Sequence, residues 1–245
     1  MVRKDVTRTD RLHPYFVGED ADHPHLAMLD NILVTYGVEN PVIAYAQGMS
    51  DLLSPLLVTL DDEALAYWAF VRVMETQQAF FHHDQKGMGL QILLLSHLLQ
   101  QTDPKLHQHF VDKEADSLIF CYRWLLVNFK REFGYADTLL LTEMLQVVPV
   151  ELTRGELGGN PFVLFVALAT LATVRQRILD WDLEHEEIIL LVNDKAGKFD
   201  VPLILRKAKE LFWRYTREED APPPPTTMAV PDGGEATDGA SLESA

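Results

Sequence analysis

Two short polar segments near the start of the chain contain side chains that could act on a phosphoryl group. Residues 2–11 read VRKDVTRTDR and carry Arg8, and residues 45–51 read YAQGMSD and carry Gln47. When a nucleoside triphosphate is hydrolysed, an arginine can neutralise charge on the equatorial oxygens of the transferring phosphoryl group, and a glutamine can orient the attacking water. The sequence has no nucleotide-cradling loop of its own. We therefore expect the pair to act on a nucleotide that another protein holds.

The elements that must hold these two segments are predicted to be helices. Apolar residues repeat at spacings of three and four between Leu26 and Tyr36, which makes one apolar helix face. Alternating β-branched segments joined by tight Asn-Gly or Asp-Gly turns are missing. The sequence therefore predicts an all-α domain. Further helices are expected from Asp61–Asp62 towards Phe81, from Asp103–Pro104, from Asn160–Pro161, and over residues 87–101, 115–131, 136–148, 184–193 and 202–216.

Composition and charge limit the kinds of partner. Of the 245 residues, 47% are hydrophobic and 24% are charged, as in a globular protein with a substantial core. The formal net charge is −16. Residues 218–245 hold seven acids and no bases, so residues 1–217 still carry −9. A surface this acidic argues against binding to nucleic acid and against stable attachment of this domain alone to an anionic membrane.

The single cysteine and the apolar runs indicate a cytoplasmic protein. Cys121 cannot form an internal disulfide, which suits a reducing compartment, and we expect it to be a buried apolar residue rather than a reactive thiol. Six of the first eleven residues are charged and no apolar stretch follows them, so no signal peptide is visible. The longest apolar run, residues 162–174, is shorter than the roughly 20 residues that a bilayer span needs. We expect a core helix there and no transmembrane segment.

A change of composition near residue 217 indicates a domain boundary. Residues 218–245 contain four consecutive prolines, Pro222–Pro225, followed by glycine, serine, threonine and acids. Such a segment buries too little apolar surface to offset the entropy of ordering, so we expect disorder. The prolines suit either a solvated linker or a polyproline ligand for an SH3-type domain. The expected organisation is one domain over residues 1–217 and an acidic tail over 218–245.

The order and spacing of the motifs resemble one known family. V-x-x-D-x-x-R-T at residues 2–9, followed by Y-x-Q-G-M at residues 45–49, is similar to the two finger motifs of the TBC domain, a family of GTPase-activating proteins for Rab GTPases. Residues 120–126, FCYRWLL, and 129–133, FKREF, resemble a further block of that family. The likeness covers roughly residues 2–215. Its R-T-D-R and Y-R-W-L-L pieces resemble the subgroup that includes TBC domain family member 25.

The resemblance implies an action on a partner. A TBC domain stimulates GTP hydrolysis by a Rab-family small GTPase and so regulates vesicle and membrane trafficking. GTP and Mg²⁺ come with the GTPase, the domain needs no cofactor or metal of its own, and peripheral attachment to endomembranes would come through partners. Arg8 falls on the family's arginine finger and Gln47 on its glutamine finger. Asp5 is then expected to orient Arg8, Tyr45 to pack under the glutamine segment or touch the partner, and Gly48 to allow close approach of the partner's backbone.

The sequence departs from the family pattern in two places. An R-x-x-x-W motif and several helices normally precede the arginine motif, whereas seven residues precede Arg8 here. We therefore expect an N-terminally truncated TBC domain: a fragment, an alternative product, a truncated gene model, or a domain whose first third is supplied differently. Where members often carry R-[IL]-W-[DE] after the FKREF block, residues 140–143 read LLTE. Altered packing is expected there, without loss of chemistry.

Other interpretations of the same residues stay open. Arg8 could be a surface or capping arginine paired with Asp5 or Asp10, and Arg11 competes for its role. Gln47 could simply start a helix. A loosely held finger would leave a helical module that binds a GTPase or an adaptor without stimulating hydrolysis. A helical scaffold unrelated to GTPases is a third hypothesis.

The remaining polar clusters indicate structure rather than chemistry. Histidines at positions 82, 83, 107 and 109 fit no compact zinc spacing, and the chain has one cysteine, so no metal site is expected. The other expected roles are a buried packing pair at Arg123–Trp124, an ion pair on one helix at Arg131–Glu132, a local cap or pair at Asp51, and support of the Arg8 turn by Thr9 and Asp10.

Overall fold

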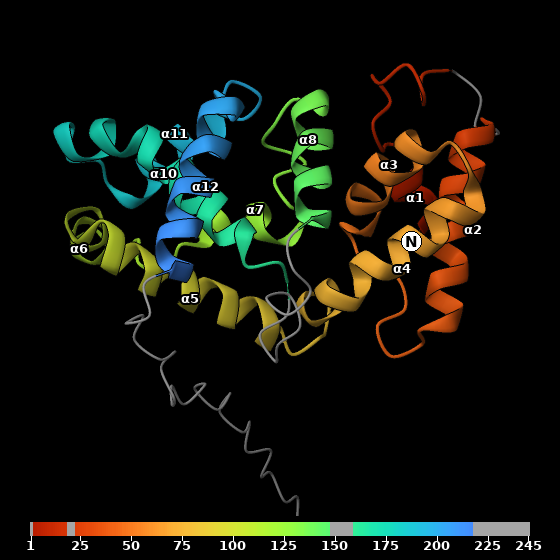
Figure 1. The fold of residues 1–245 in the computed structure, drawn as a ribbon, viewed down its shortest axis with the longest axis horizontal. Helices are drawn as coiled ribbons and strands as arrows, with labels where there is room; N and C mark the ends of the chain where they lie inside the picture. Colours follow the sequence, from red (N-terminus) through yellow and green to blue (C-terminus); the bar gives the residue numbers. More distant parts are fainter. Residues whose placement is uncertain (1, 19–22, 148–158, 218–245) are drawn as a thin grey trace, which may run out of the picture.

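The computed structural model describes residues 2–18, 23–147 and 159–217, and every regular element in them is a helix (Figure 1). This confirms the all-α class expected from the sequence. The tail 218–245, with Pro222–Pro225, lies outside the described residues, so its disorder and the boundary at 217 stay predictions. The elements are α1 (Val2–Val6), α2 (Pro24–Glu39), α3 (Met49–Leu60), α4 (Glu63–Gln77), η1 (Gln78–Phe80), α5 (Lys86–Thr102), α6 (Pro104–Asp112), η2 (Ile119–Cys121), α7 (Tyr122–Leu126), α8 (Tyr135–Gln146), α10 (Phe162–Asp180), α11 (His185–Asp194) and α12 (Val201–Arg217).

Side-chain caps set where two of these helices begin. The Asp62 carboxylate accepts a hydrogen bond from the backbone N–H of Leu65 at 2.8 Å, and Asp103 accepts one from Leu106 at 3.1 Å. Each acid binds an N–H group that the first helical turn leaves without an intrahelical partner. α4 and α6 therefore start where the sequence placed them. Asp61, by contrast, ends α3 in a left-handed conformation with a φ of 47°.

Two helical groups lie side by side, and α8 stands between them (Figure 1). In the first group α2 packs against α1, α3 and α4. In the second group α10 packs against α5, α6 and α12. Because α8 contacts both α3 and α12, it joins the two groups.

α10 is the apolar centre of the second group. Every residue from Phe162 to Leu171 is buried, and the ring of Phe165 meets that of Phe212 in α12 with centroids 5.3 Å apart. Within the described ranges, α10 alone is long and apolar enough to cross a membrane, and 67% of its most apolar window is buried inside the molecule. This burial agrees with the core helix expected from the sequence.

The single helix expected over residues 115–131 is wrong. In its place lie η2, the five-residue α7 and a turn in which Asn128 and Phe129 have φ angles of 48° and 60°. Positive φ interrupts a right-handed helix. The turn lets the buried rings of Trp124 and Phe129 pack with centroids 5.3 Å apart. It also directs the residues that follow towards α3 and the N-terminal segment.

α3 is a helix that the periodicity argument did not find. Its sequence, MSDLLSPLLVTL, is apolar on most sides and includes Pro55. Leu53 and Leu57 are fully buried. A helix that is apolar nearly all round belongs in a core, and α3 packs against α2, α4 and α8. Because α3 starts directly after Gly48, its packing fixes the place of Gln47.

Candidate functional site

One polar cleft of about 530 Å³ is lined by both Arg8 and Gln47. Arg8 follows α1, and Gln47 precedes α3 by two residues. Lys130 and Arg131, from the turn after α7, line a third side. The side chain of Arg8 is 59% exposed, and Gln47 is exposed as well. The two groups singled out by the sequence therefore face one shared space.

The side chain of Arg8 is held by an acid one helical turn earlier. Its Nη2 donates a hydrogen bond to Oδ1 of Asp5, whose side chain is only 8% exposed. Thr9 donates from Oγ1 to the Asp5 carbonyl at 2.8 Å, which tightens the same turn. A guanidinium has several N–H donors, so a single bond to Asp5 leaves others for a second anion. The contact expected between Asp5 and Arg8 is present.

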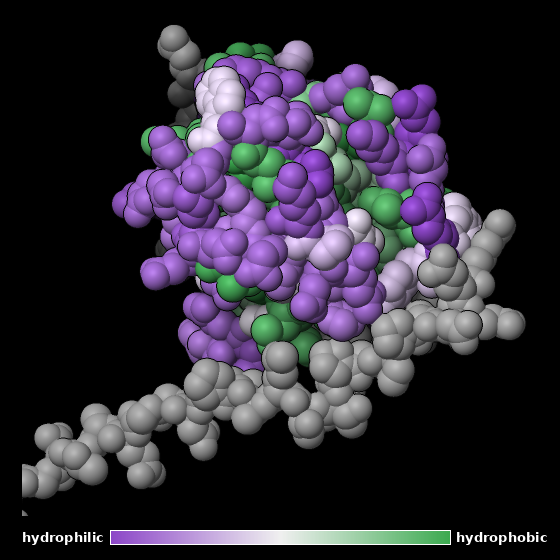
Figure 2. All heavy atoms as spheres, turned by 90° about the vertical axis from the view of Figure 1, so that its left-hand side faces the viewer, coloured by the Kyte–Doolittle hydropathy of each residue, from purple (hydrophilic) through white to green (hydrophobic). Residues whose placement is uncertain are grey.

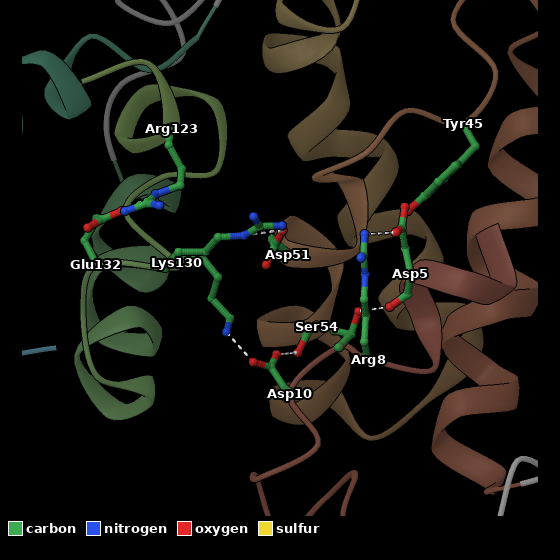
Figure 3. A network of polar contacts seen from close by, with 11 residues as sticks. Asp5, Arg8, Asp10, Tyr45, Asp51, Ser54, Arg123, Lys130 and Glu132 are labelled. Atoms are coloured by element: carbon green, nitrogen blue, oxygen red, sulfur yellow. Dashed lines mark hydrogen bonds and ion pairs between the residues drawn. The ribbon is translucent and has the colours of Figure 1, made fainter. Parts of the chain in front are cut away.

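Asp5 also binds the glutamine segment (Figure 3). The Tyr45 hydroxyl donates to Oδ2 of Asp5 at 2.7 Å. Burial raises the pKa of Tyr45 above its usual value, and the bond to Asp5 raises it further, so the phenol keeps its proton and remains a donor. Because Tyr45 stands two residues before Gln47, one carboxylate links both segments. Tyr45 therefore binds a residue of its own domain, which agrees with the expectation that it supports the glutamine segment from within.

The amide of Gln47 is unrestrained within the described part of the chain. Its side chain is exposed at the cleft and forms no hydrogen bond with those residues. Gly48, next to it, is buried and has a φ of 104°, in the left-handed region that favours glycine. A β-carbon there would lie 3.1 Å from Cγ1 of Val127. Backbone conformation and packing inside the domain therefore explain this glycine, whereas the sequence suggested a close approach of the partner.

A buried lysine ties the segment after Arg8 to the turn after α7. Lys130 donates from Nζ to Oδ1 of Asp10 at 2.6 Å, across 120 positions of the chain, and its side chain is 7% exposed. Asp10 accepts a second hydrogen bond, on Oδ2, from Ser54 of α3. The Lys130 ammonium also lies 4.6 Å from the ring centroid of Tyr135. The bridge fixes the backbone two residues beyond Arg8 (Figure 3).

Arg131 forms a second link across the cleft. It donates from Nη2 and Nε to Oδ2 of Asp51 at 2.8 and 3.2 Å, and these bonds raise the pKa of Arg131. The ion pair expected between Arg131 and Glu132 is wrong. Glu132 is fully buried and accepts a hydrogen bond from Nε of Arg123 at 2.6 Å. Since the side chain of Arg123 is 43% exposed, it is not the buried packing partner expected for Trp124.

The cleft brings three cations and three acids together in pairs. The pairs are Arg8 with Asp5, Lys130 with Asp10, and Arg131 with Asp51. A chain with a net charge of −16 thus gathers positive groups at one place, each held in direction by a carboxylate. In the ranges that the structure covers, no group of three or more His, Cys, Asp or Glu side chains converges to hold a metal ion. The arrangement suits fixed charges and hydrogen bonds aimed at a phosphate from outside.

Comparison with known proteins assigns the chain to a family. Residues 1–179 match the family model of the Rab-GTPase-TBC domain. The chain belongs to the Rab-GTPase-TBC domain family. This TBC domain is 46% identical to TBC1 domain family member 25 of Homo sapiens over 58% of the chain described here. It is 36% identical to the GTPase-activating protein GYP7 of Yarrowia lipolytica over 88% of the same chain. It spans 21% and 31% of those two proteins, respectively. The resemblance found in the motifs is confirmed.

Solved TBC domains have the same fold. The YPT/Rab-GAP domain of Gyp1p matches with a TM-score of 0.68 at 21% identity, over 87% of this chain and 71% of that chain. The flagellar RabGAP TBC domain of Chlamydomonas matches with a TM-score of 0.66 at 20% identity, over 85% of this chain and 66% of that one. At these identities the likeness establishes the fold.

The sequence analysis did not predict that Lys130 and Arg131 line the cleft with Arg8 and Gln47. Both stand in the FKREF block that helped to indicate the family, and two adjacent cations among aromatic residues were the available signal. Arg11, the competitor of Arg8, donates to the Gly18 carbonyl and lines a neighbouring cleft that does not include Gln47. The geometry therefore favours Arg8 as the partner of Gln47.

Proposed function

We propose that this TBC domain is a GTPase-activating protein that stimulates GTP hydrolysis by a Rab-family small GTPase. The observation that carries the proposal is the shared cleft, which Arg8 and Gln47 line from separate segments at an exposed surface. Membership of the Rab-GTPase-TBC domain family supports the same activity. Such a protein would regulate vesicle and membrane trafficking from the cytoplasm and would reach endomembranes through its partners.

Arg8 would supply positive charge to the transition state. GTP and Mg²⁺ arrive with the GTPase, and this chain contributes no cofactor. The guanidinium can keep one N–H on Asp5 while its other donors bind oxygens of the γ-phosphate. Arginine fingers of this kind are worth roughly 10³–10⁵ in rate. Asp5, itself bound by Tyr45, sets the direction from which the guanidinium approaches.

Gln47 would orient the attacking water. A carboxamide offers both a donor and an acceptor, so it can hold a water molecule and direct its lone pair. Within the part of the chain that is described, the Gln47 amide has no bond to break before it turns to a partner. Its backbone is nevertheless held, because α3 begins just after Gly48 and Tyr45 binds Asp5.

Substitution of either finger tests the activity. We expect Arg8→Ala and Gln47→Ala each to lower stimulated hydrolysis by at least about 100-fold, because each removes a group that acts in the transition state. The measurement is single-turnover GTP hydrolysis across a panel of Rab GTPases. Arg206→Ala and Gln176→Ala, at exposed positions on α12 and α10, are the matched controls. Full activity of both finger variants, with the fold intact, would overturn the proposal.

A second candidate is a helical module that binds a GTPase or an adaptor without stimulating hydrolysis. The pairing of all three cations in the cleft favours it, because each bound carboxylate reduces the positive charge that the cleft offers to a phosphate. The same assay separates the two candidates. Binding of a GTP-loaded Rab with an unchanged rate of hydrolysis supports the module.

A further inference from the structure

A second cleft adjoins the first on the other side of the Asp10–Lys130 bridge. Its volume is about 500 Å³, and Arg8, Asp10 and Lys130 line both clefts. Gln47 lines only the first cleft, and Leu12 lines only the second. The finger mechanism uses nothing in this second space.

Leu12 is the most accessible apolar group at the second cleft. It is 98% exposed, more than any other large hydrophobic residue in the described part of the chain. Pro14 is exposed nearby, and the rings of Phe133 and Tyr135 line the same space. Single exposed apolar residues are common on protein surfaces. Here, however, the leucine stands with other apolar groups at the rim of a concave site.

The turn that presents Leu12 is fixed on both sides. The N–H of His13 donates to the Asp10 carbonyl at 2.8 Å, and the N–H of Phe16 donates to the His13 carbonyl at 2.9 Å. The His13 ring stacks on that of Tyr135 with centroids 4.1 Å apart, and Phe16 is fully buried. A turn that is already ordered loses little conformational entropy when it binds. The fold itself therefore holds Leu12 out into solvent.

The occupant of the second cleft follows from the position of Arg8. If Arg8 enters the nucleotide site of a GTPase, the surface around that site lies next to both clefts, because Arg8 lines both. We propose that the second cleft receives an apolar side chain of the same GTPase, next to its nucleotide site, and that Leu12 packs against that side chain. This inference rests on the proposed function and adds a binding subsite to it.

The lining of the cleft favours an apolar side chain over a second anion. Lys130 already binds a carboxylate, the Arg11 guanidinium donates to the Gly18 carbonyl, and the remaining donors of Arg8 are assigned to the γ-phosphate in the proposed function. Burial of a leucine side chain against a partner is worth about ten- to hundredfold in affinity. Leu12 would thus contribute to recognition of the partner, while Arg8 and Gln47 contribute to the rate.

Leu12→Asp and Leu12→Ala test the subsite in single-turnover assays in which the concentration of this protein is varied. We expect Leu12→Asp to raise the concentration needed for half-maximal stimulation by at least about tenfold, or about 1.4 kcal/mol. The maximal rate should stay unchanged, because the contact is equally strong in the ground and transition states. Leu12→Ala should give a smaller rise. Leu190→Asp, at a site on α11 that is 68% exposed, is the matched control and should change neither value.

The possible results separate the subsite from the proposed function. If the unmodified protein stimulates hydrolysis and Leu12→Asp behaves identically, the subsite is overturned and the function stands. If the protein binds a GTP-loaded Rab without stimulation, the function is overturned, and the subsite stands only if Leu12→Asp weakens that binding about tenfold. If no Rab is bound or stimulated, both are overturned. Melting curves should show unchanged Tm values, because Leu12 contributes almost no buried area.

Discussion

At the scale of single residues, the arrangement of the cleft depends most on Asp5. A carboxylate that is nearly buried needs partners for both oxygens, and here Arg8 binds one while Tyr45 binds the other. Each donor belongs to a segment with its own proposed chemical role. The positions of the arginine and the glutamine are therefore coupled through one side chain.

Removal of the Tyr45 hydroxyl should loosen that coupling. Tyr45→Phe keeps the ring and deletes the donor, which leaves one oxygen of Asp5 without its bond. We expect the free energy of unfolding to fall by about 1–3 kcal/mol. We also expect the maximal stimulated rate to fall by roughly tenfold, because Arg8 and Gln47, the proposed catalytic groups, lose their alignment. Urea denaturation and single-turnover hydrolysis measure the two effects.

The control for this change is Tyr215→Phe. The ring of Tyr215 packs against Phe165, away from the cleft. The Tyr215→Phe substitution should leave the rate of stimulated hydrolysis unchanged. Equal losses of rate in the two tyrosine variants would show that the bond from Tyr45 to Asp5 has no part in positioning.

At the scale of elements, the sequence was most informative where apolar periodicity coincides with a capping acid. α4 and α6 begin after Asp62 and Asp103 as expected. The periodicity argument failed over residues 115–131, where the packing of Trp124 and Phe129 accompanies a sharp turn. Helix propensity is a weak preference that tertiary contacts override, and this turn depends on such contacts.

The same limit applies to the cleft. Motif spacing singled out Arg8 and Gln47, and both line one cleft, although their action in hydrolysis stays a prediction. The contribution of Lys130 could not be predicted in this way, since it stands 120 positions from Asp10 and no local pattern relates the two. Only the three-dimensional path of the turn after α7 brings them together.

Loss of Lys130 should detach this turn from the N-terminal segment. Lys130→Met keeps most of the side-chain volume but removes the ammonium, so Asp10 loses its cation. We expect about 2–4 kcal/mol of destabilisation, somewhat less than for a fully buried pair because the side chain of Asp10 is 17% exposed. Adding Asp10→Asn should recover part of the loss. Urea denaturation of both single variants and the double variant measures the coupling, and strict additivity would show that the pair does not interact.

At the scale of the whole molecule, the surface and the net charge limit how a partner can be recognised. The face formed by the second helical group is mostly hydrophilic, with isolated apolar spots (Figure 2). The chain as a whole carries −16, which does not attract phosphate groups over long distances. We therefore expect recognition of the proposed GTPase to depend on short-range contacts around the two clefts.

Alkaline pH should destabilise the fold through four tyrosines. Burial raises the pKa of Tyr15, Tyr36, Tyr45 and Tyr135 above the usual value of 10.0. A group whose pKa is raised by folding contributes stability that is fully present below its unfolded pKa and is lost as the pH rises above that value. The free energy of unfolding should therefore decrease above pH 10.0.

Urea unfolding at successive pH values, together with the ultraviolet absorbance of phenolate, measures this effect. Tyr45→Phe should make the decrease shallower, because one of the four groups no longer ionises. Ionisation of every tyrosine at its usual pH in a protein that stays folded would contradict the expectation.

The bridge between Asp10 and Lys130 also has a consequence for synthesis. Ribosomes add about 5–20 residues per second, so the 120 positions between these partners correspond to about 6–24 s of translation. During that interval a nascent chain displays Arg8 without the lysine that fixes the following turn. The turn after Arg8 acquires its final position only after Lys130 has left the ribosome and the segment that carries it has folded back onto Asp10.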